Sequence, residues 1–373
     1  MIINRMPKGL RKFLPLSVKR FVVSLYIKWL MRKGPQGFEK PRVNFAGVLP
    51  PEGQFLRGGK VKLKYLRKRW GEYKNNFNII YLVSSALPAY PDIWVKEAKR
   101  RGIKVFWNQN GIGVKAWAPD TWQRINKEMS SLKFADYVAY QSNFAKGEAD
   151  DLVAKATGPW SIIVNSCEID TFKPAVHHPP LKPFRIMVLG TAMTPEKIMI
   201  PLEALKILTD KGFDAELRSY GPAEWPNAEE EINQKIKEWN LDGKVIRRGK
   251  YLQHESPDLY REGHVFIHTK HMDSSPNVLP EAMASGLPVI TGSTGGSAEW
   301  TTPTAGITIE VPISREKFYY PSPEAVATAI EEISKDWLKW SIGARENAVS
   351  NFSTEKFLAS HALAFKKIGI QNV

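Results

Sequence analysis

The residues best suited to chemistry lie between positions 274 and 299, where one acid stands near the start of a predicted helix. This helix begins near Asn277, after a short loop, and carries Glu281 in its first turns. A buried strand over 287–291 and a glycine-rich turn over 292–296 follow directly. A helix start offers free N–H groups and a positive dipole end to a phosphate, and a carboxylate there can accept hydrogen bonds from two sugar hydroxyls. Together these features suggest that the segment binds a nucleotide or a nucleotide-sugar.

This segment resembles the donor-site signature of the GT-B glycosyltransferases grouped as family 4. That signature has two acids separated by seven residues, followed by an Ala-Met-Ala-x-Gly-x-Pro-Val run. Here Glu281 is the second acid, and residues 282–289 supply the run AMASGLPV. Asp273 stands at the first acid, which is usually Glu, so its side chain is one methylene shorter. The alternative is an ordinary helix–strand unit whose acids are incidental.

A second segment resembles the phosphate loop of the same family, in which a Lys follows an Arg by six residues. Lys197 stands at the Lys position, whereas Thr191, next to Gly190, stands where Arg is expected. A preorganised cation can offset the charge that develops on the pyrophosphate as the bond to the sugar breaks. The alternative for Lys197 is a solvated surface lysine. Three other arginines of this half of the chain could supply the missing charge: Arg185, Arg247 and Arg248.

The resemblance implies a role for each candidate residue of the donor site. Glu281 is expected to bind the ribose hydroxyls, and Asp273 the hydroxyls of the donor sugar. Backbone N–H groups over 277–279 are expected to contact the phosphate or the sugar. The predicted donor-binding residues are Gly190, Thr191, Lys197, Tyr251, Leu252, Asp273, Asn277, Val278, Leu279 and Glu281. The predicted catalytic residues are Lys197, Asp273, Glu281 and Asn110.

In the first half of the chain, Asn110 stands where many members of the family carry a His close to the reacting sugar. Asn cannot act as a general base, although it can hydrogen-bond a sugar hydroxyl. The family is thought to retain configuration by a front-face route in which the donor phosphate assists, so this difference does not exclude transfer. Gly58 and Gly59 resemble the family's glycine loop, where glycine permits close approach of the backbone to donor or acceptor. An ordinary turn is the alternative.

Three histidines near Asp273 raise the question of a metal site. His264 and His268 are four residues apart on a predicted strand and would share a face, and His271 follows. GT-B enzymes generally need no metal, and the resemblance already gives this segment a role. We therefore expect neither a metal nor another cofactor.

The composition is typical of a globular protein with two domains. The chain has 373 residues, of which 43% are hydrophobic and 24% are charged. Cys167 is the only cysteine, so an intrachain disulfide is excluded, which fits a reducing cytosol. No cleavable signal peptide is recognisable, because charged residues interrupt the apolar stretch near the N-terminus.

The positive charge is concentrated at the N-terminal end. Residues 1–74 hold 19 Lys and Arg against three Glu, although the formal net charge of the whole chain is +15. The remainder is close to neutral, so the positive charge belongs to one end and not to the whole fold. Nucleic-acid binding through this basic end is a further alternative, although no nucleic-acid partner is expected. Leu14–Met31 combines this charge with apolar side chains and predicts a basic amphipathic helix that lies on an anionic membrane surface. Its longest uncharged run, Phe21–Ile27, is too short to span a bilayer, and the alternative is a helix packed on the protein's own surface.

From about Val43 onward, strand candidates such as 43–48 alternate with helices, which is typical of α/β folds with parallel sheets. A proline-rich run over 174–183 interrupts the alternation, and Phe184–Leu189 restarts it. With the resemblance, this pattern predicts the GT-B architecture of two Rossmann-like domains facing a cleft. The predicted parts are a basic amphipathic segment (1–40), an acceptor-binding domain (41–180), a nucleotide-sugar donor-binding domain (181–350) and a C-terminal helix (351–373) that crosses back.

The resemblance implies a retaining hexosyltransferase that uses a UDP- or GDP-sugar. The expected acceptor is a lipid-linked or cell-envelope glycan, as in polysaccharide or lipopolysaccharide biosynthesis, and the amphipathic segment favours peripheral attachment to the cytoplasmic face of a membrane. One alternative is a GT-B sugar-nucleotide epimerase, which would turn over UDP-sugar without an acceptor. The other is a nucleotide-sugar-binding protein that has lost catalysis, which Thr191 and Asn110 would favour.

Overall fold

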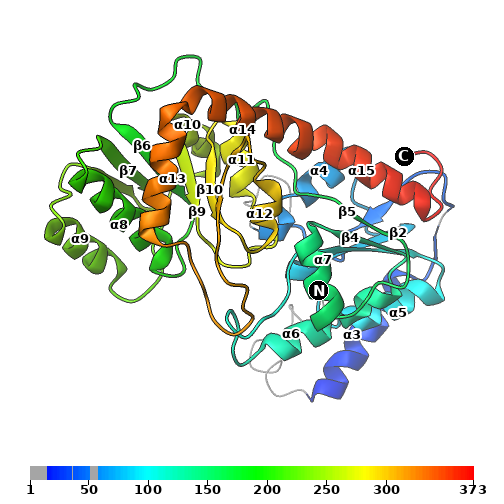
Figure 1. Cartoon of the computed structure of the whole chain (residues 1–373). Helices are drawn as coiled ribbons and strands as arrows, with labels where there is room; N and C mark the ends of the chain where they lie inside the picture. The colour runs from blue at the N-terminus through cyan, green and yellow to red at the C-terminus, as the bar shows by residue number, and fades with distance from the viewer. Residues whose placement is uncertain (1–14, 36, 51–57) are drawn as a thin grey trace. The chain divides into compact units, whose positions relative to one another are not determined.

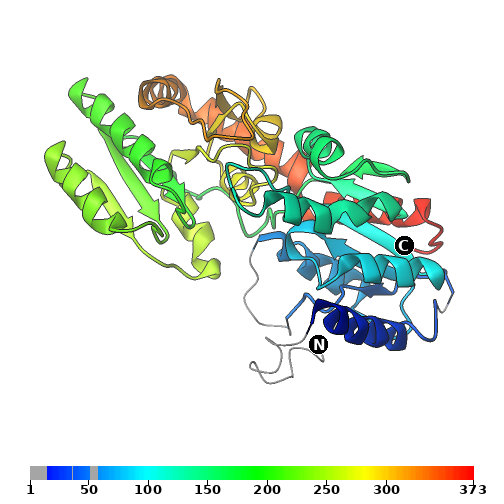
Figure 2. The ribbon, with the colours of Figure 1, turned by 90° about the horizontal axis from the view of Figure 1, so that it is seen from below.

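The structure of the protein is a computed structural model that describes residues 15–35, 37–50 and 58–373. The chain divides into two compact units, each built on its own parallel sheet (Figure 1, Figure 2). The first unit comprises the chain up to Val164 together with Phe357–Val373, and the second comprises Asn165–Lys356. The sequence places the boundary in the proline-rich run, between residues 180 and 181, whereas the division falls earlier, between Val164 and Asn165. Residues 1–14 of the predicted N-terminal segment lie outside the described residues.

The first unit has a five-stranded sheet in the order β1-β2-β3-β4-β5. Its inner strands are buried on both faces, as in parallel sheets that helices cover on both sides, and every residue of the β2 run IIYLV is buried, whereas the edge strand β5 is partly exposed. β1 is shorter than the predicted strand 43–48, because Ala46 and Gly47 have φ angles of 53° and 70° that end the extended conformation. The strands are β1 (Val43–Asn44), β2 (Ile79–Val83), β3 (Lys104–Gln109), β4 (Tyr137–Tyr140) and β5 (Trp160–Ile162).

Separate sets of helices cover the two faces of this sheet (Figure 2). Trp94 and Trp107 belong to the core on the side of α3, α5 and α6. On the other side, α4 and α15 pack against Tyr81 and Phe106, whose rings stack 4.8 Å apart. The helical elements are α3 (Leu16–Leu30), η1 (Gly58–Lys60), α4 (Leu63–Trp70), η2 (Ser84–Ala86), α5 (Pro91–Arg100), α6 (Trp122–Met129), η3 (Ser130–Phe134), α7 (Asn143–Leu152) and α15 (Thr354–Lys367).

The second unit has a six-stranded sheet in the order β11-β10-β9-β6-β7-β8. Its first strand in sequence, β6, therefore lies between β9 and β7. The strands are β6 (Phe184–Leu189), β7 (Ala215–Tyr220), β8 (Val245–Arg248), β9 (Val265–His268), β10 (Val289–Gly292) and β11 (Gly306–Ile309). The helical elements are α8 (Glu196–Asp210), α9 (Ala228–Glu238), η4 (Gln253–Glu255), α10 (Ser256–Arg261), α11 (Val278–Ala284), α12 (Gly296–Trp300), α13 (Pro323–Lys335) and α14 (Trp337–Phe352).

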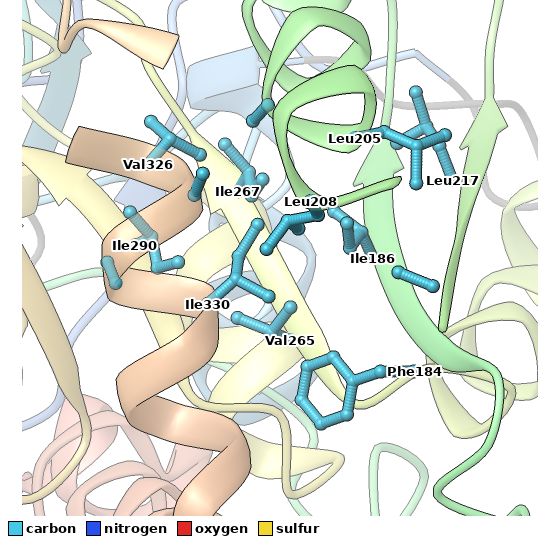
Figure 3. Close-up of a cluster of buried hydrophobic side chains, with 14 of the residues drawn as sticks. Phe184, Ile186, Leu205, Leu208, Leu217, Val265, Ile267, Ile290, Val326 and Ile330 are labelled. Atoms are coloured by element: carbon cyan, nitrogen blue, oxygen red, sulfur yellow. The ribbon is translucent and has the colours of Figure 1, made fainter. Parts of the chain in front are cut away.

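Helices α8 and α13 bury one face of the second sheet in an apolar core (Figure 3). Ile267 and Ile290 from the sheet meet Leu205 from α8 and Ile330 from α13, and all four side chains are buried. Close packing of this kind leaves little freedom to shift the strands. The core therefore fixes the positions of the loops that leave the carboxyl ends of the strands, where the candidate site lies.

The amphipathic helix predicted over 14–31 corresponds to α3, and Leu14 lies outside the described residues. Val23, Ile27 and Met31 are buried in the core of the first unit. Four large apolar side chains of the same helix remain exposed: Leu16 by 66%, Phe21 by 63%, Leu25 by 50% and Trp29 by 55%. The helix thus packs on its own protein and also presents apolar side chains to solvent. Within the described part of the chain, no helix has the length and apolarity needed to cross a membrane.

The predicted α/β class with two parallel-sheet units is confirmed. The boundaries of the signature elements differ slightly from the prediction. α11 ends at Ala284, and Gly286 follows with a φ of 83°, a left-handed conformation that commonly terminates helices. β10 begins at Val289 and not at Leu287, since Pro288 has no N–H to donate to the sheet.

Candidate functional site

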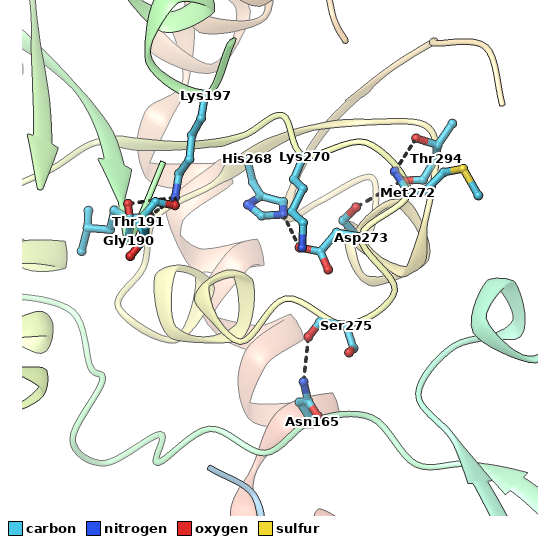
Figure 4. Close-up of polar contacts among 12 residues, drawn as sticks. Asn165, Gly190, Thr191, Lys197, His268, Lys270, Met272, Asp273, Ser275 and Thr294 are labelled. Carbon is cyan, nitrogen blue, oxygen red and sulfur yellow. Dashed lines mark hydrogen bonds and ion pairs between the residues drawn. The ribbon is translucent and has the colours of Figure 1, made fainter. Parts of the chain in front are cut away.

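The predicted donor-site residues of the second unit gather at the carboxyl edge of its sheet. β6 and β9 pair in parallel, so the loops after them leave from the same edge. Lys197 follows the loop after β6, and Asp273 lies in the loop after β9. In open α/β sheets this is the edge at which ligands bind. The fold therefore places a cation and an acid, 76 positions apart in sequence, in one region (Figure 4).

Lys197 lies in the first turn of α8 and extends back to the end of β6 (Figure 4). Its Nζ donates hydrogen bonds to the carbonyl oxygens of Leu189, Gly190 and Thr191, at 2.8, 3.0 and 3.1 Å. An ammonium group has three N–H donors, so these carbonyls engage all of them and hold the charge in one place. Burial and the nearby Lys270 ammonium lower the pKa of Lys197 to about 8, although the Asp273 carboxylate opposes this shift.

Gly190 shapes the loop around this ammonium. Its φ is 88°, in the left-handed region that favours glycine. A Cβ at this position would lie 3.4 Å from the Lys197 Nζ. The glycine therefore lets the chain turn so that three successive carbonyls face one ammonium group.

Thr191 is exposed and contributes its carbonyl to Lys197 but no charge. The arginines proposed as substitutes are engaged elsewhere. Arg185 lies near the amino end of β6, away from the loop, and the side chains of Arg247 and Arg248 are paired with carboxylates. The carboxylate partners are Glu216 for Arg185, Glu229 for Arg247 and Glu255 for Arg248. All three guanidinium groups are therefore already paired with carboxylates.

Asp273 is held by two basic side chains, one from the end of β9 and one from the loop that follows (Figure 4). Its Oδ2 lies 3.1 Å from Nε2 of His268 and 3.3 Å from Nζ of Lys270. Burial alone would raise the pKa of Asp273, but the Lys270 ammonium and the hydrogen bond from His268 outweigh burial and hold this pKa well below its usual range. Burial lowers the pKa of His268, against the effect of Asp273. Asp273 is therefore a fixed negative charge at neutral pH.

The glycine-rich turn after β10 supports the backbone of Asp273. The carbonyl oxygen of Asp273 accepts a hydrogen bond from the Gly296 N–H at 2.9 Å. Gly295 has a φ of 94°, and a Cβ there would lie 2.6 Å from the same oxygen. Glycine is required by this close approach, so one role of the turn is to position the acid.

Glu281 lies in the first turn of α11, as predicted, and contacts a buried tyrosine. The Tyr260 hydroxyl is 3.3 Å from Oε2 of Glu281 and 3.3 Å from the carbonyl oxygen of Val278. Burial and the Glu281 charge raise the pKa of Tyr260 well above its ordinary value, so the hydroxyl stays protonated. The same two causes raise the pKa of Tyr251 to about 12. Both tyrosines, from α10 and the loop after β8, therefore lie in the field of this carboxylate.

The loop ahead of α11 is held by a residue from the start of the second unit. Asn165 Nδ2 donates to the carbonyl oxygen of Ser275 at 2.9 Å and to Oδ1 of Asn277 at 2.7 Å. The Leu279 side chain is fully buried, so only its backbone could face a ligand. Leu252, in contrast, is 62% exposed next to Tyr251.

Of four further residues in this region, sequence reasoning missed Tyr260, Lys270 and Asn165 and considered His268 only as a possible metal ligand. Three of them act through neighbours that the sequence did single out, since they hydrogen-bond Glu281, Asp273 and Asn277. The signal for Lys270 was its place directly after a predicted strand, three residues before the first acid. Lysines are also common in solvated loops, so only the position of Lys270 next to Asp273 distinguishes it from a surface lysine.

The three histidines do not converge. His264 Nδ1 accepts from the Arg185 N–H at 2.8 Å, and its ring stacks on Phe184. His268 contacts Asp273, whereas the two ring nitrogens of His271 lie 3.0 and 2.9 Å from backbone carbonyls of another loop. Within residues 15–35, 37–50 and 58–373, no group of three or more His, Cys, Asp or Glu side chains is arranged to hold a metal ion.

On the first unit, Asn110 joins the loops after β2 and β3. Its Oδ1 accepts from the Ser84 hydroxyl at 2.8 Å and from the Ser85 N–H at 3.0 Å, and its Nδ2 donates to the Ser85 hydroxyl at 2.8 Å. Gly59 packs directly on this cluster, because a Cβ there would lie 2.4 Å from Ser85 Oγ and 2.5 Å from Asn110 Nδ2. Gly58 has a φ of 55°. Gly59 therefore leaves no room for a side chain next to the Asn110 amide, which joins the two loops.

Comparisons with known proteins agree with this architecture. Residues 183–336 match the family model described as glycosyl transferases group 1. No curated protein matches the sequence of this chain. Among solved structures, HepE from Anabaena in complex with UDP is 18% identical with a TM-score of 0.62, and the match covers 78% of this chain and 79% of HepE.

Two further solved structures are similar to the same extent. Sucrose-phosphate synthase from Thermosynechococcus elongatus is 16% identical, with a TM-score of 0.62 over 86% of this chain and 82% of that one. A glycosyltransferase from Rickettsia africae is 18% identical, with a TM-score of 0.62 over 86% and 84%. Residues 183–336 are therefore a domain of the glycosyl transferases group 1 family, and the chain as a whole has the GT-B fold of two Rossmann-like domains.

Proposed function

We propose that the protein transfers a hexose from a UDP-sugar to a lipid-linked or cell-envelope glycan, with retention of configuration, at the surface of a membrane. The observation that carries the donor half of this proposal is the carboxyl edge of the second sheet. There Lys197 holds a positive charge, Asp273 is a fixed carboxylate, and Glu281 lies in the first turn of α11. A positive charge can bind the pyrophosphate of the donor, and the two carboxylates can accept hydrogen bonds from the hydroxyls of the sugar and of the ribose.

The choice of UDP over GDP is supported by similar structures. HepE from Anabaena was solved with UDP and with UDP-glucose. TarM from S. aureus, which is 14% identical with a TM-score of 0.56, was solved with UDP. We therefore infer a UDP-sugar as donor, with a GDP-sugar as the second choice.

Each candidate residue receives a role in this proposal. Glu281 binds the ribose hydroxyls, Asp273 binds hydroxyls of the donor sugar, and Lys197 stabilises the charge on the leaving diphosphate. The backbone over 277–279 and residues Tyr251 and Leu252 complete the donor site. The first unit binds the acceptor, and Asn110 acts there as a positioning residue for the glycine loop. No metal is assigned a role.

A panel of nucleotide-sugars tests the donor assignment. A ligand that binds only the folded state raises the melting temperature, so UDP-sugars are expected to raise it more than GDP- or ADP-sugars. Proton NMR of the product should then show the anomeric configuration of the donor, and EDTA should leave the rate almost unchanged. An inverted product would contradict the proposal. Turnover of UDP-sugar without acceptor would indicate an epimerase instead, and binding without any turnover would indicate a protein that has lost catalysis.

The proposed attachment to a membrane is supported by α3, which has one side buried in the first unit and one side exposed to solvent. The helix is anchored to the first unit by Val23 and Ile27, so its orientation is fixed. Its exposed apolar side chains, Leu16, Phe21, Leu25 and Trp29, can then enter a lipid interface without unfolding any part of the unit. Lys28, Arg32 and Lys33 are exposed on or just after the same helix, and anionic lipid attracts each such charge by about 1 kcal/mol. We infer peripheral attachment to the cytoplasmic face of a membrane.

The triple variant Phe21→Ser, Leu25→Ser, Trp29→Ser tests this attachment. Burial of a large apolar side chain stabilises by roughly 1.5–3 kcal/mol, so the variant is expected to sediment at least about 100-fold less well with vesicles of phosphatidylglycerol and phosphatidylcholine. Its melting temperature and UDP affinity should be unchanged, because all three side chains are exposed.

A matched control removes three exposed apolar side chains from α14, with Leu338→Ser, Ile342→Ser and Val349→Ser. This control should sediment with the vesicles like the wild-type protein. Added salt should weaken vesicle binding by the wild type and by the control alike. Failure of the wild-type protein to bind these vesicles at low salt would contradict the attachment and remove the main support for a lipid-linked acceptor.

A further inference from the structure

Two lysines lie at the carboxyl ends of neighbouring strands in the second unit (Figure 4). Lys197 reaches the end of β6, and Lys270 follows β9 by two residues. β6 and β9 pair in parallel, so both ammonium groups occur at the same edge of the sheet. The Lys270 ammonium is close enough to lower the pKa of Lys197. The two cations therefore share one local electrostatic environment.

The charges at this edge favour an anion. Asp273 lies 3.3 Å from the Lys270 Nζ and also interacts electrostatically with Lys197. His268 contacts the same carboxylate, and burial favours its neutral form. Two ammonium groups against one carboxylate leave this group of four side chains with a net positive charge. Two neighbouring positive charges repel each other, and binding of an anion relieves this repulsion.

The two lysines differ in how they could meet a ligand. All three N–H donors of Lys197 are directed at backbone carbonyls, which fixes its position. The Lys270 side chain is 46% exposed and sits on a four-carbon stem, so its ammonium can turn toward a ligand while it stays near Asp273. Arg185, Arg247 and Arg248 are paired with carboxylates elsewhere in the unit.

We propose that Lys270 contacts the pyrophosphate of the nucleotide-sugar and supplies the second positive charge that the phosphate loop lacks at Thr191. This inference rests on the proposed function and assigns a specific residue to it. When the bond between the sugar C1 and the phosphate oxygen breaks, its electron pair stays on that oxygen. The acceptor oxygen forms the new bond to C1, and its proton passes to the leaving diphosphate. Lys270 stabilises the negative charge that accumulates on the diphosphate before this proton arrives.

Binding of UDP and of uridine to a Lys270→Met variant separates this contact from a general effect. The variant is expected to bind UDP about tenfold more weakly, because a charge-assisted hydrogen bond contributes of that order. Its affinity for uridine, which has no phosphate, should be unchanged. Lys270→Arg should retain most of the UDP affinity. Lys211→Met is the matched control, since Lys211 is 49% exposed, pairs with Glu331 and lies at the opposite end of α8 from Lys197. This control should bind both ligands like the wild type.

A double-mutant cycle with Asp273→Asn excludes an indirect effect. If Lys270 only positions Asp273, then Lys270→Met will have no further effect on UDP binding in the Asp273→Asn background. If Lys270 contacts the pyrophosphate directly, Lys270→Met should weaken UDP binding by a further tenfold in the Asp273→Asn background as well. UDP binding by the double variant should also depend less on salt than UDP binding by Asp273→Asn. An unchanged UDP affinity in Lys270→Met, or an equal loss for uridine, would also overturn the inference. If the wild-type protein binds neither UDP nor GDP, the proposed function itself fails and this assignment fails with it.

Discussion

Replacing Glu281 with alanine is expected to lower the affinity of the protein for UDP by about 100-fold and to bring sugar transfer below detection. A carboxylate that accepts two ribose hydroxyls contributes roughly 1.5–3 kcal/mol per hydrogen bond, and about 1.4 kcal/mol corresponds to a tenfold change in affinity. The fold should persist, since the Tyr260 hydroxyl keeps its contact with the Val278 carbonyl at 3.3 Å. Isothermal titration calorimetry and a melting curve measure the two effects separately.

The ligand dependence of this variant identifies the contact. Uridine carries the ribose but no phosphate, so its binding should weaken by the same factor as that of UDP. Glu203→Ala removes an exposed glutamate from the middle of α8 and should leave both affinities unchanged. A folded Glu281→Ala protein with normal uridine affinity would contradict the assignment of Glu281 to the ribose.

Replacing Lys197 with methionine is expected to reduce kcat by about 100- to 1,000-fold, the range observed when one preorganised donor is removed from a developing negative charge. The affinity for UDP should fall much less, because the charge on the diphosphate is greatest in the transition state. Lys197→Arg should not restore kcat, since a planar guanidinium cannot present three donors to the carbonyls of Leu189, Gly190 and Thr191 as a compact ammonium does. A larger effect on UDP affinity than on kcat would assign Lys197 to ground-state binding instead.

The pH dependence provides an independent test of Lys197. Its pKa is about 8, so kcat/KM for the donor should decline above about pH 8 as the free enzyme loses this charge. In the complex the phosphates favour the protonated form, and the corresponding decline in kcat should occur at higher pH. An unchanged alkaline decline of kcat/KM in Lys197→Met would contradict this assignment.

The effect of Lys197 on stability has the opposite dependence on pH. In the unfolded state the pKa of this lysine is near 10.5, so between pH 8 and 10.5 the unfolded state binds more protons than the folded state. The contribution of Lys197 to the free energy of unfolding therefore rises with pH over this range.

The elements of the second unit could be predicted well from sequence because their signals are local. Apolar runs such as Phe184–Leu189 identify buried strands over a few residues, and the order of helix, strand and glycine turn near Glu281 is contained in one short window. The errors occurred where a local rule was overridden. β1 ends early, at Asn44, because Ala46 shortly after it has a positive φ that is unusual for a residue with a side chain.

The partners of the candidate residues could not be predicted, because they come from distant segments. Tyr260 reaches Glu281 from 21 residues away, and Asn165 reaches Asn277 from 112 residues away. The three arginines considered for the missing charge were equivalent in sequence, yet each pairs with a different carboxylate in the fold. Asn110 illustrates the same limit, since its amide is engaged with Ser84 and Ser85.

Residue type, spacing and hydrophobic periodicity carry information over short distances, and this information was enough to predict the α/β class, the family of the second domain, and the candidate acids and lysine. Which charges become neighbours depends on the tertiary fold. The strand order β9-β6 brings Lys270 beside Lys197, and the packing of α3 determines which of its apolar side chains remain exposed. Electrostatic interactions fall off with distance in space and not with separation in sequence, so these arrangements exist only once both sheets have formed.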